Sequence, residues 1–332
     1  MKTTLVTMML GLAILFATST TAFADVINVN PFAPMGNYNV IVFGNYTQLG
    51  SGDTEGYLAV QGNLTTGGAY GVSSKTPYNP NTTALVVGST LTTGGNWKVF
   101  NGNAYYGNSP SSNPISFDAG YGRVGTHSVD FAQAYNDMAW FSQELAKMTS
   151  GGQVVYQSYG TYITAGSGMQ VVNLYLDDFV NSRMYEGSSV AWFGNGLHIN
   201  GQSDTQLLIN IIGGDKYSDL MWTQGDMFVN GLKNENIMFN FVDVDKFIVQ
   251  GASLYASVLA VDTTLVASSG FISGNVAFGE IMVSSGYEFH NDWRFKGTYD
   301  FESPPVVPEP ATLAVLGLGL AGLGLARRQM TK

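Results

Sequence analysis

Three pairs of acidic residues stand close enough in the sequence to do chemistry together. They are Asp53 with Glu55, Asp177 with Asp178, and Asp243 with Asp245. Two carboxyl groups about 5 to 10 Å apart can hydrolyse a glycosidic bond. In a strand, Asp243 and Asp245 would also point to one face, where their oxygens could bind calcium. Such pairs are common in a chain with many carboxylates, so we assign no catalytic residue.

Histidines and nucleotide motifs give no further chemistry. His127, His198 and His290 are far apart, and none has a second His or a Cys at ligand spacing, which argues against a zinc site. Each is expected to be a surface or structural residue. The sequence has no G-x-S-x-G nucleophile motif and no phosphate-binding G-x-x-x-x-G-K-[ST]. We therefore predict no cofactor and no nucleophilic enzyme.

Aromatic side chains offer a binding chemistry instead. Trp97, Tyr105 and Tyr106 stand among Gly and Asn residues that favour a loop, where their rings could stack on sugars. Exposed rings also suit protein contacts, and buried ones fill a core. Glycan contact by these three residues is a hypothesis.

A repeat indicates which elements position these residues. The pentapeptide LTTGG occurs at 64–68 and again at 91–95, within a longer match in which equivalent residues are 27 apart. The aligned apolar pairs are Leu58 with Leu85, Val60 with Val87, and Leu64 with Leu91. Similar short apolar runs that end in Gly, Asn or Ser recur near residues 246–285, where Val258 and Val276 are 18 apart. This pattern predicts short strands joined by tight turns.

Loose repeats of this length predict a mainly β fold, a right-handed β-solenoid in which each turn of chain stacks on the last. In this interpretation the leucine of LTTGG points inward, the threonines are exposed, and the glycines turn a corner where a Cβ would clash. A β-sandwich with two similar hairpins is the alternative.

One segment has helical rather than strand periodicity. Apolar residues from Phe131 to Met148 recur every three or four positions and predict a helix over about 129–148 with one buried face. Ser128 or Asp130 can cap its start, and two glycines at 151 and 152 can end it. We expect this helix to pack alongside the β-structure.

Composition limits the class of protein. Gly contributes 41 of 332 residues and charged residues only 11%, which favours many tight turns and a surface of small polar side chains. Cysteine is absent, so disulfides and thiolate metal sites are excluded. Residues 25–305 carry 23 acidic and 10 basic side chains, a net charge of −13, which disfavours nucleic acid as a partner.

Both ends of the sequence carry targeting signals. Residues 1–24 are typical of a signal peptide, with Lys2 before an apolar stretch and with Ala22 and Ala24 at the positions that signal peptidase reads. A membrane helix is the weaker alternative because the apolar stretch is short. We therefore expect export and a mature domain over 25–300.

The C-terminal tail has three parts in a fixed order. A Pro-rich linker at 301–307 leads to Pro308, Glu309 and Pro310, then to an apolar run over 311–326, and finally to Arg327 and Arg328. A helix over that run would be about 24 Å long, slightly shorter than the membrane core. The arginines would stay on the cytoplasmic side and leave the body outside. A plain membrane anchor would need no Pro-Glu-Pro.

The tail over 308–330 closely resembles the PEP-CTERM sorting signal of exopolysaccharide-producing Gram-negative bacteria. That resemblance implies a helix that inserts in the membrane only transiently and a cut near Pro308 to Pro310 by the membrane enzyme exosortase.

The body resembles the choice-of-anchor A domain. The resemblance rests on NYNVIVFGNYTQLGSGDTEGYLAVQGNLT near the start, VDFAQAY at the helix, NIMFNF at 236–241, and SLYASVLAVDTTLVASSGFISGNVAFGEIMVSSGYEFHN near the end. It implies an extracellular, adhesive role without an established ligand. Many members have a Pro-rich loop where this chain has VLAVDT at 258–263.

These observations predict a secreted, non-enzymatic surface or matrix protein that takes part in adhesion or in biofilm and exopolysaccharide assembly. The alternative from another class is a glycoside hydrolase or lyase on the same scaffold. Ice binding would need a regular threonine-rich face, and LTTGG occurs only twice.

Overall fold

A computed structural model describes residues 26–108, 114–149, 151–223 and 225–302. These residues belong to two units. The smaller unit contains an antiparallel pair of strands, β1 (Val26–Val29) and β29 (Tyr299–Glu302). The larger unit spans Asn30–Thr298 and carries every described residue of the candidate sites.

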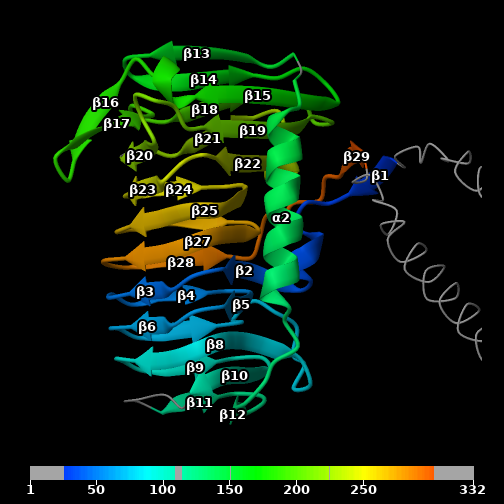
Figure 1. The fold of residues 1–332 in the computed structure, drawn as a ribbon, viewed down its shortest axis with the longest axis vertical. Coiled ribbons are helices and arrows are strands. Elements are labelled where there is room, and N and C mark those ends of the chain that lie inside the picture. The colour runs from blue at the N-terminus through cyan, green and yellow to red at the C-terminus, as the bar shows by residue number, and fades with distance from the viewer. Residues whose placement is uncertain (1–25, 109–113, 150, 224, 303–332) are drawn as a thin grey trace, which may run out of the picture. The chain divides into compact units, whose positions relative to one another are not determined.

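The larger unit is mainly β, with short strands stacked beside one long helix, α2 (Phe131–Ala146) (Figure 1). We name its three sides by a feature of each. The helix side, next to α2, holds β12 (Gly122–Val124), β10 (Asn103–Asn108), β5 (Tyr57–Val60), β2 (Tyr38–Val42), β22 (Ile237–Val242), β19 (Gln206–Ile212), β15 (Met169–Tyr175) and the first parts of β8 (Thr83–Thr93), β27 (Val276–Val283) and β25 (Ser257–Ala267).

The threonine side holds the second parts of those three long strands together with β6 (Leu64–Thr66), β3 (Tyr46–Gln48), β23 (Lys246–Gln250), β20 (Asp219–Thr223), β17 (Ser188–Trp192) and β16 (Ser182–Tyr185). The histidine side holds a seven-stranded sheet of β11 (Ile115–Phe117), β9 (Trp97–Val99), β7 (Tyr70–Val72), β4 (Gly52–Thr54), β28 (Tyr287–His290), β26 (Gly270–Ser273) and β24 (Ala252–Leu254). It also holds a four-stranded sheet of β21 (Met227–Asn230), β18 (Leu197–Asn200), β14 (Gly160–Thr164) and β13 (Gln153–Gln157).

Neighbouring strands in these sheets pair in parallel, except that β13 with β14 and β16 with β17 are antiparallel. Three short 3-10 helices, η1 (Ala33–Met35), η2 (Leu176–Asp178) and η3 (Asn234–Asn236), lie in the connections. A β-sandwich is built from antiparallel sheets, so this pairing does not fit the sandwich alternative.

The chain enters the stack in the middle. From β2 it proceeds strand by strand to β12, and α2 then leads to the other end of the stack at β13 (Figure 1). The following strands return toward the middle, where β27 pairs with β2 and β3, and β28 pairs with β4. The first and last thirds of the domain therefore meet in parallel at this junction.

The two copies of the sequence repeat form adjacent rungs, where a rung is one turn of the chain in the stack. Its aligned residues are register partners, namely Leu58 with Leu85, Val60 with Val87, and Leu64 with Leu91. The pair 18 residues apart, Val258 and Val276, is also in register. These repeats are thus confirmed as stacked positions, and the leucines are buried as predicted.

The threonines of LTTGG do not share one environment. Thr65 and Thr92 are half-buried, whereas Thr66 and Thr93 are buried, because successive side chains of a strand point to opposite faces. The prediction that both threonines are exposed is therefore wrong for the second one. The glycines do sit at a close approach, since a Cβ on Gly67 would lie 2.4 Å from the Leu49 carbonyl oxygen of the next rung.

The helix α2 lies inside the range that its periodicity predicts. Asp130 caps its start, where the side chain accepts a hydrogen bond from the Gln133 backbone N–H at 3.0 Å. Its buried face consists of Phe131, Ala134, Met138, Phe141, Ser142 and Leu145. The helix ends at Ala146, before the two glycines that were expected to end it.

A buried polar ladder attaches α2 to the sheet. Asn173, Asn210 and Asn240 are in register on β15, β19 and β22, and their side-chain amides bond in series at 2.8 and 2.9 Å. The Asn240 amide also donates to the Ser142 carbonyl at 2.9 Å, and the Asn210 amide donates to the Leu145 carbonyl at 2.9 Å. Each of these acceptors belongs to the last turns of α2, so the ladder fixes the helix against three strands.

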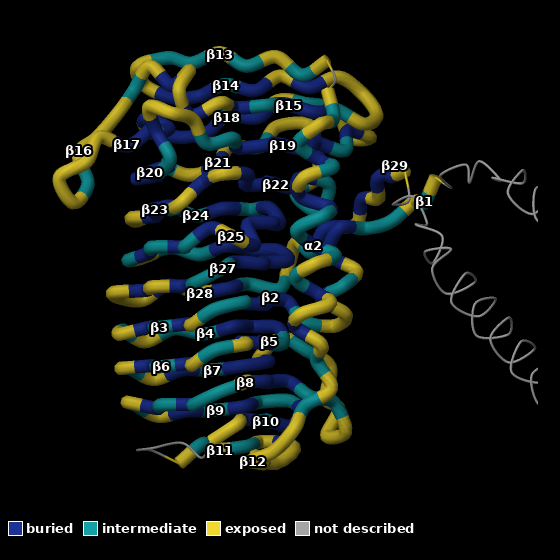
Figure 2. Tube along the Cα trace, viewed as in Figure 1, coloured by how far each residue is buried: buried dark blue, intermediate teal, exposed yellow. Residues whose placement is uncertain are grey.

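The core lies between the three sides. Figure 2 shows buried residues along the strands and exposed residues gathered at the turns. Among the described residues, no helix has the length and apolar character needed to cross a bilayer. The predicted membrane segment at 311–326, like the signal peptide, lies outside the described residues.

Candidate functional site

An in-register row of uncharged side chains runs along the outer surface of the threonine side. Strand alternation places Thr65 outward, in register between Thr47 and Thr92 of the neighbouring strands. The row continues from Thr47 to Met282 and then to Val266. We call these five residues the outer row. Because neighbouring strands are about 4.8 Å apart, the row presents uncharged groups at a regular spacing.

Apolar groups are exposed beside the outer row. Leu49 is 61% exposed and Met282 is 49% exposed, and both line a hollow of about 420 Å³. Tyr185, from the antiparallel β16 and β17 pair, lines the same hollow. Exposed apolar groups that gather on one surface are characteristic of binding surfaces.

Beyond Val266, the residues that continue the row in register are covered by other side chains. Ile248 and Met221 continue the row, but both are buried in a small cluster against Tyr185 and Trp192. The exposed part of the outer row therefore ends where the β16 and β17 pair begins.

Buried hydrogen bonds hold the strands behind the outer row. The Tyr46 hydroxyl donates to Gln48 Oε1 at 2.5 Å and lies 2.8 Å from the Tyr70 hydroxyl. The Tyr70 hydroxyl in turn lies 2.8 Å from Thr54 Oγ1. These groups are buried, so their mutual bonds satisfy polar atoms that water cannot reach.

Trp97 belongs to this interior. It lies in β9 with 1% of its surface exposed, its Nε1 donates to Thr66 Oγ1 at 2.6 Å, and its ring stacks on Tyr70 at 5.0 Å. It is therefore a core residue, which corrects the prediction that its ring is free in a loop to contact a glycan. Strand alternation was the missing information, since Gly and Asn around Trp97 also occur at the turns between short strands.

Tyr105 and Tyr106 lie on β10 and face opposite sides of the strand. Tyr106 is buried, so the prediction that it contacts a glycan is wrong, as it is for Trp97. Tyr105 is half-buried, and a hydrogen bond with Tyr121 raises the pKa of its hydroxyl. Its contact with a glycan stays a prediction.

A second group of chemical side chains lies on the histidine side at the junction of β4 and β28. The ligating atoms of Asp53, Glu288 and His290 lie within 4.8 Å of one another, and so do those of Glu55, His290 and Asp292. His290 Nε2 is 3.1 Å from Glu288 Oε2, and its ring stacks on Phe271 at 4.2 Å. Lys75 balances part of this charge through Glu55 at 2.8 Å.

We call these residues the junction cluster. Carboxylate and imidazole ligands of this kind suit a divalent cation. Only register brings Asp53 and Glu288 together, because they are 235 residues apart in the sequence. Sequence spacing paired Asp53 with Glu55 and had no signal for Glu288 or His290.

Within the junction cluster, the ionised form of Asp53 is disfavoured. Burial, and then the neighbouring Glu288 and Glu55 carboxylates, raise the pKa of Asp53 to about 6. Its Oδ1 is buried and accepts no hydrogen bond from the described residues. Asp53 thus binds a proton more tightly in the folded chain than in the unfolded one, so stability falls as the pH rises from about 4 to 6 and stays reduced above that.

Asp53→Asn is therefore expected to raise the free energy of unfolding at pH 8 by about 1 kcal/mol, after allowance for the partial exposure of the group, and to change it little at pH 4. Urea unfolding in EDTA at both pH values measures the difference. The exposed Asp204→Asn is the matched control. An equal effect of Asp53→Asn at the two pH values would contradict this assignment.

The other acidic pairs have structural positions. Asp177 accepts hydrogen bonds from the backbone N–H groups of Asp215, Lys216 and Tyr217 at 3.0 to 3.1 Å. These bonds hold the loop at 215–217 in place, so the Asp177 carboxylate has a structural role. Asp243 and Asp245 lie in the turn between β22 and β23, where Asp243 has a φ of +55°. This corrects their placement on a strand. Neither belongs to a group of three ligating atoms among the described residues.

The remaining histidines make ring contacts. His198 stacks between Tyr162 at 4.5 Å and Phe228 at 4.8 Å on the histidine side. His127 packs edge-on against Phe131 at 5.4 Å. Both contacts agree with a structural role.

Comparison with known families identifies the domain. Residues 31–291 match the family model described as "Putative Ice-binding-like adhesive domain". The chain belongs to this family. The adhesive domain so defined covers the stack from before β2 to the end of β28. It is not specifically the choice-of-anchor A domain, so that resemblance holds only at the coarser level of an adhesive-type domain.

The adhesive domain is followed by a second match. Residues 306–328 match the PEP-CTERM protein-sorting motif, which confirms the prediction made from Pro308 to Pro310 and the two arginines. These residues, with Ala22 and Ala24, lie outside the described residues. No curated protein matches the chain in sequence.

Solved structures similar to the adhesive domain include the DUF3494 domain of Shewanella frigidimarina ice-binding protein_1, at 14% identity and a TM-score of 0.40, covering 79% of this chain and 97% of that one. An ice binding protein from an Antarctic Biological Consortium has 13% identity and a TM-score of 0.42, covering 82% and 92%. The ice-binding protein of the Antarctic ascomycete Antarctomyces psychrotrophicus has 11% identity and a TM-score of 0.30, covering 80% and 96%.

Proposed function

We propose that the chain is a secreted, exosortase-sorted protein of the cell surface or extracellular matrix that adheres to extracellular polymer through its outer row. The membership of the adhesive family and the sorting motif support export and adhesion. The outer row is the observation that supports this particular surface, because Thr47, Thr65 and Thr92 are uncharged, in register and next to exposed apolar groups.

The proposal includes a layout for the whole chain. Signal peptidase removes residues 1–24 after Ala24, the adhesive domain spans 25–300, and 301–307 links it to the sorting segment at 308–330. The apolar run inserts in the inner membrane of a Gram-negative cell until exosortase acts near Pro308 to Pro310. The parallel stacking supports a β-solenoid, and its right-handed turn remains part of the proposal.

Thr65→Lys tests the adhesive surface. A lysine there is expected to lower the fraction of the full chain that cosediments with exopolysaccharide from its own host at least tenfold, because a hydrated charge separates the other two threonines of the outer row. Thr164→Lys, at an exposed position of β14 on the histidine side, is the matched control. Equal retention of the two variants would remove the outer row as the adhesive surface.

A second candidate function is enzymatic, because the junction cluster lies at an exposed hollow. Asp53 and Glu288 line a hollow of about 420 Å³ with Lys98 and Phe100, and the raised pKa of Asp53 suits a general acid. A carbohydrate-active enzyme would release reducing ends or unsaturated sugars from host polysaccharide, and Glu288→Gln would abolish that release. An adhesive protein would release neither.

Ice is another regular surface that the outer row could contact. The threonine row is longer than two LTTGG motifs indicate, because Thr47 adds a third rung. Inhibition of ice recrystallisation by the full chain, lost in Thr65→Lys, would favour ice. Recrystallisation at the rate of the buffer would favour the polymer.

A further inference from the structure

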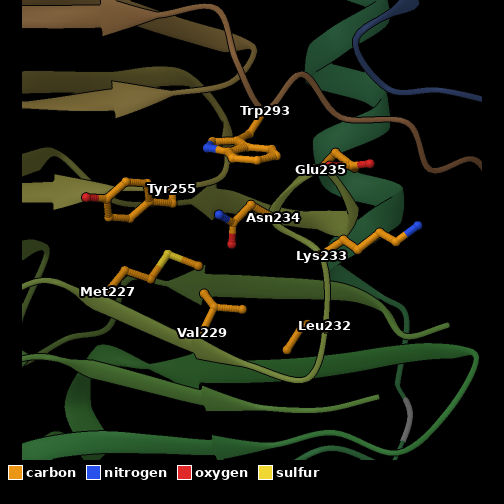
Figure 3. Close-up of a pocket in the computed structure, with 8 residues that line it drawn as sticks. All are labelled: Met227, Val229, Leu232, Lys233, Asn234, Glu235, Tyr255 and Trp293. Carbon is orange, nitrogen blue, oxygen red and sulfur yellow. The ribbon is translucent and has the colours of Figure 1, made fainter. Parts of the chain in front are cut away.

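A pocket with a volume of about 600 Å³ lies away from the outer row, between β21, η3 and the segment that follows β28. Figure 3 shows Trp293 and Tyr255 on two sides of it, with Met227 and Val229 opposite Trp293. Small-molecule sites of this size are lined by apolar and aromatic groups with a few polar groups that orient the ligand. This pocket has the same combination.

Trp293 is exposed although its neighbours hold the backbone firmly. The Phe295 backbone N–H donates to Ser257 Oγ at 3.1 Å and to Asn275 Oδ1 at 3.0 Å. Arg294 donates to the Tyr38 carbonyl at 2.7 Å. Trp293 itself is 37% exposed and stacks on no other aromatic ring of the described residues. A large ring is therefore kept at the surface by an ordered segment, ready to contact a flat apolar partner.

Tyr255 forms the second aromatic wall. Its ring packs edge-on against Phe271, with centroids 5.1 Å apart and planes at 84°. This contact fixes the orientation of the ring, whose hydroxyl points away from Asn234 and Trp293 (Figure 3). The two rings come from positions 38 residues apart that only the stacking of rungs brings together.

Asn234 supplies the polar group. Its side chain points into the space between Trp293 and Val229 (Figure 3), and its amide makes no hydrogen bond with the described residues. The short helix η3 is ordered by the Asn236 N–H, which donates to the Lys233 carbonyl at 3.0 Å. The Asn234 amide thus holds an N–H donor and a carbonyl acceptor in place at the centre of the pocket.

Charged groups stand at the edge and face elsewhere. Lys233 and Glu235 point away from the pocket centre (Figure 3), and Glu235 is paired with Lys296 at 3.2 Å. The body as a whole has a net charge of −13, which repels polyanions. The pocket therefore matches a neutral ligand and not an acidic one.

We propose that this pocket binds a neutral pyranose residue of an extracellular polysaccharide. The apolar C–H face of the sugar lies on the Trp293 indole, its hydroxyls bond to the Asn234 amide, and the Tyr255 ring forms the second wall. This inference deepens the proposed adhesive function and rests on it for the polymer, but it places a second contact on a different side of the stack from the outer row.

The test titrates the full chain, purified with its tail in mild detergent, with neutral tetrasaccharides of glucose, mannose and galactose and with tetragalacturonate. Isothermal titration calorimetry measures the binding, because its signal does not depend on the tryptophan that one variant removes. We expect at least one neutral tetrasaccharide to bind and tetragalacturonate to give no binding signal. Trp293→Ala and Asn234→Ala should each weaken that binding at least tenfold. Trp192→Phe, at a half-buried tryptophan of the threonine side, should leave it unchanged.

Two results would overturn the pocket: no neutral tetrasaccharide binds, or Trp293→Ala binds as tightly as the unmodified chain. Thr65→Lys separates this proposal from the adhesive surface, since it should lose cosedimentation with polymer and keep tetrasaccharide binding. Loss of cosedimentation in Thr65→Lys without any tetrasaccharide binding would retain the outer row and remove the pocket. If a tetrasaccharide binds and Thr65→Lys has no effect on cosedimentation, the pocket is retained and the outer row is removed as the adhesive surface.

Discussion

Asn240→Ala is expected to lower the free energy of unfolding by about 3 kcal/mol. The Asn240 side chain is buried, and it donates to Asn210 Oδ1 and to the Ser142 carbonyl while its Oδ1 accepts from the Ser142 hydroxyl at 2.7 Å. Alanine removes all three bonds at once. Each former partner then remains in a place that water does not reach, and an unsatisfied buried group costs about 1 to 3 kcal/mol.

A second asparagine pair in the same fold provides the control. Asn200 and Asn230 are register partners on β18 and β21, and the Asn230 amide donates to Asn200 Oδ1 at 3.2 Å in an exposed position. Asn230→Ala should cost less than about 0.5 kcal/mol, because water replaces the lost bond. Urea unfolding followed by circular dichroism measures both variants. Similar small losses in both would show that the ladder does not hold α2 on the sheet.

The sequence predicts elements better than it predicts their neighbours. The apolar spacing from Phe131 to Leu145 defines the face of α2 that is buried, since a helix repeats every 3.6 residues whatever it packs on. The LTTGG repeat likewise predicts stacked rungs, because equivalent residues of a repeat occupy equivalent places. Both signals are local.

The junction of β2 and β27 has no such signal. It pairs Val40 with Val276, although no repeat links the two segments, and the chain between them passes through the whole stack. The junction cluster depends on the same pairing and was therefore missed except for its acidic residues near position 53. Residues 153–235 form β13 to β21 without a clear period in the sequence, because their rungs vary in length.

The candidate binding residues illustrate a different limit. Trp97 and Trp293 each follow a polar residue in the sequence, but Trp97 is buried and Trp293 is exposed. Trp97 lies on a short strand, and register with the next rung decides which face of that strand is inward, whereas Trp293 follows the end of β28 in a connecting segment. Composition alone thus located aromatic residues without showing which of them a ligand could reach.

Gly94→Ala is expected to lower the free energy of unfolding by about 3 kcal/mol, as much as the loss of the asparagine ladder. A Cβ at Gly94 would lie 2.6 Å from the carbonyl oxygens of both Thr66 and Gly67 on the next rung. These are backbone atoms that already pair the two rungs, so they cannot move aside without lengthening the hydrogen bonds of β6 and β8. The requirement for glycine therefore comes from the distance between rungs, which explains why LTTGG is repeated at stacked positions.

Gly166→Ala is the matched control, because the nearest atom to its added Cβ is 3.6 Å away on the side chain of Gln170. It should change the free energy of unfolding by less than about 0.5 kcal/mol. Thermal and urea unfolding of the two variants gives the comparison. If Gly94→Ala proved as stable as Gly166→Ala, neighbouring rungs could separate at the corner, and the close contact between Gly94 and Gly67 would not limit the sequence there.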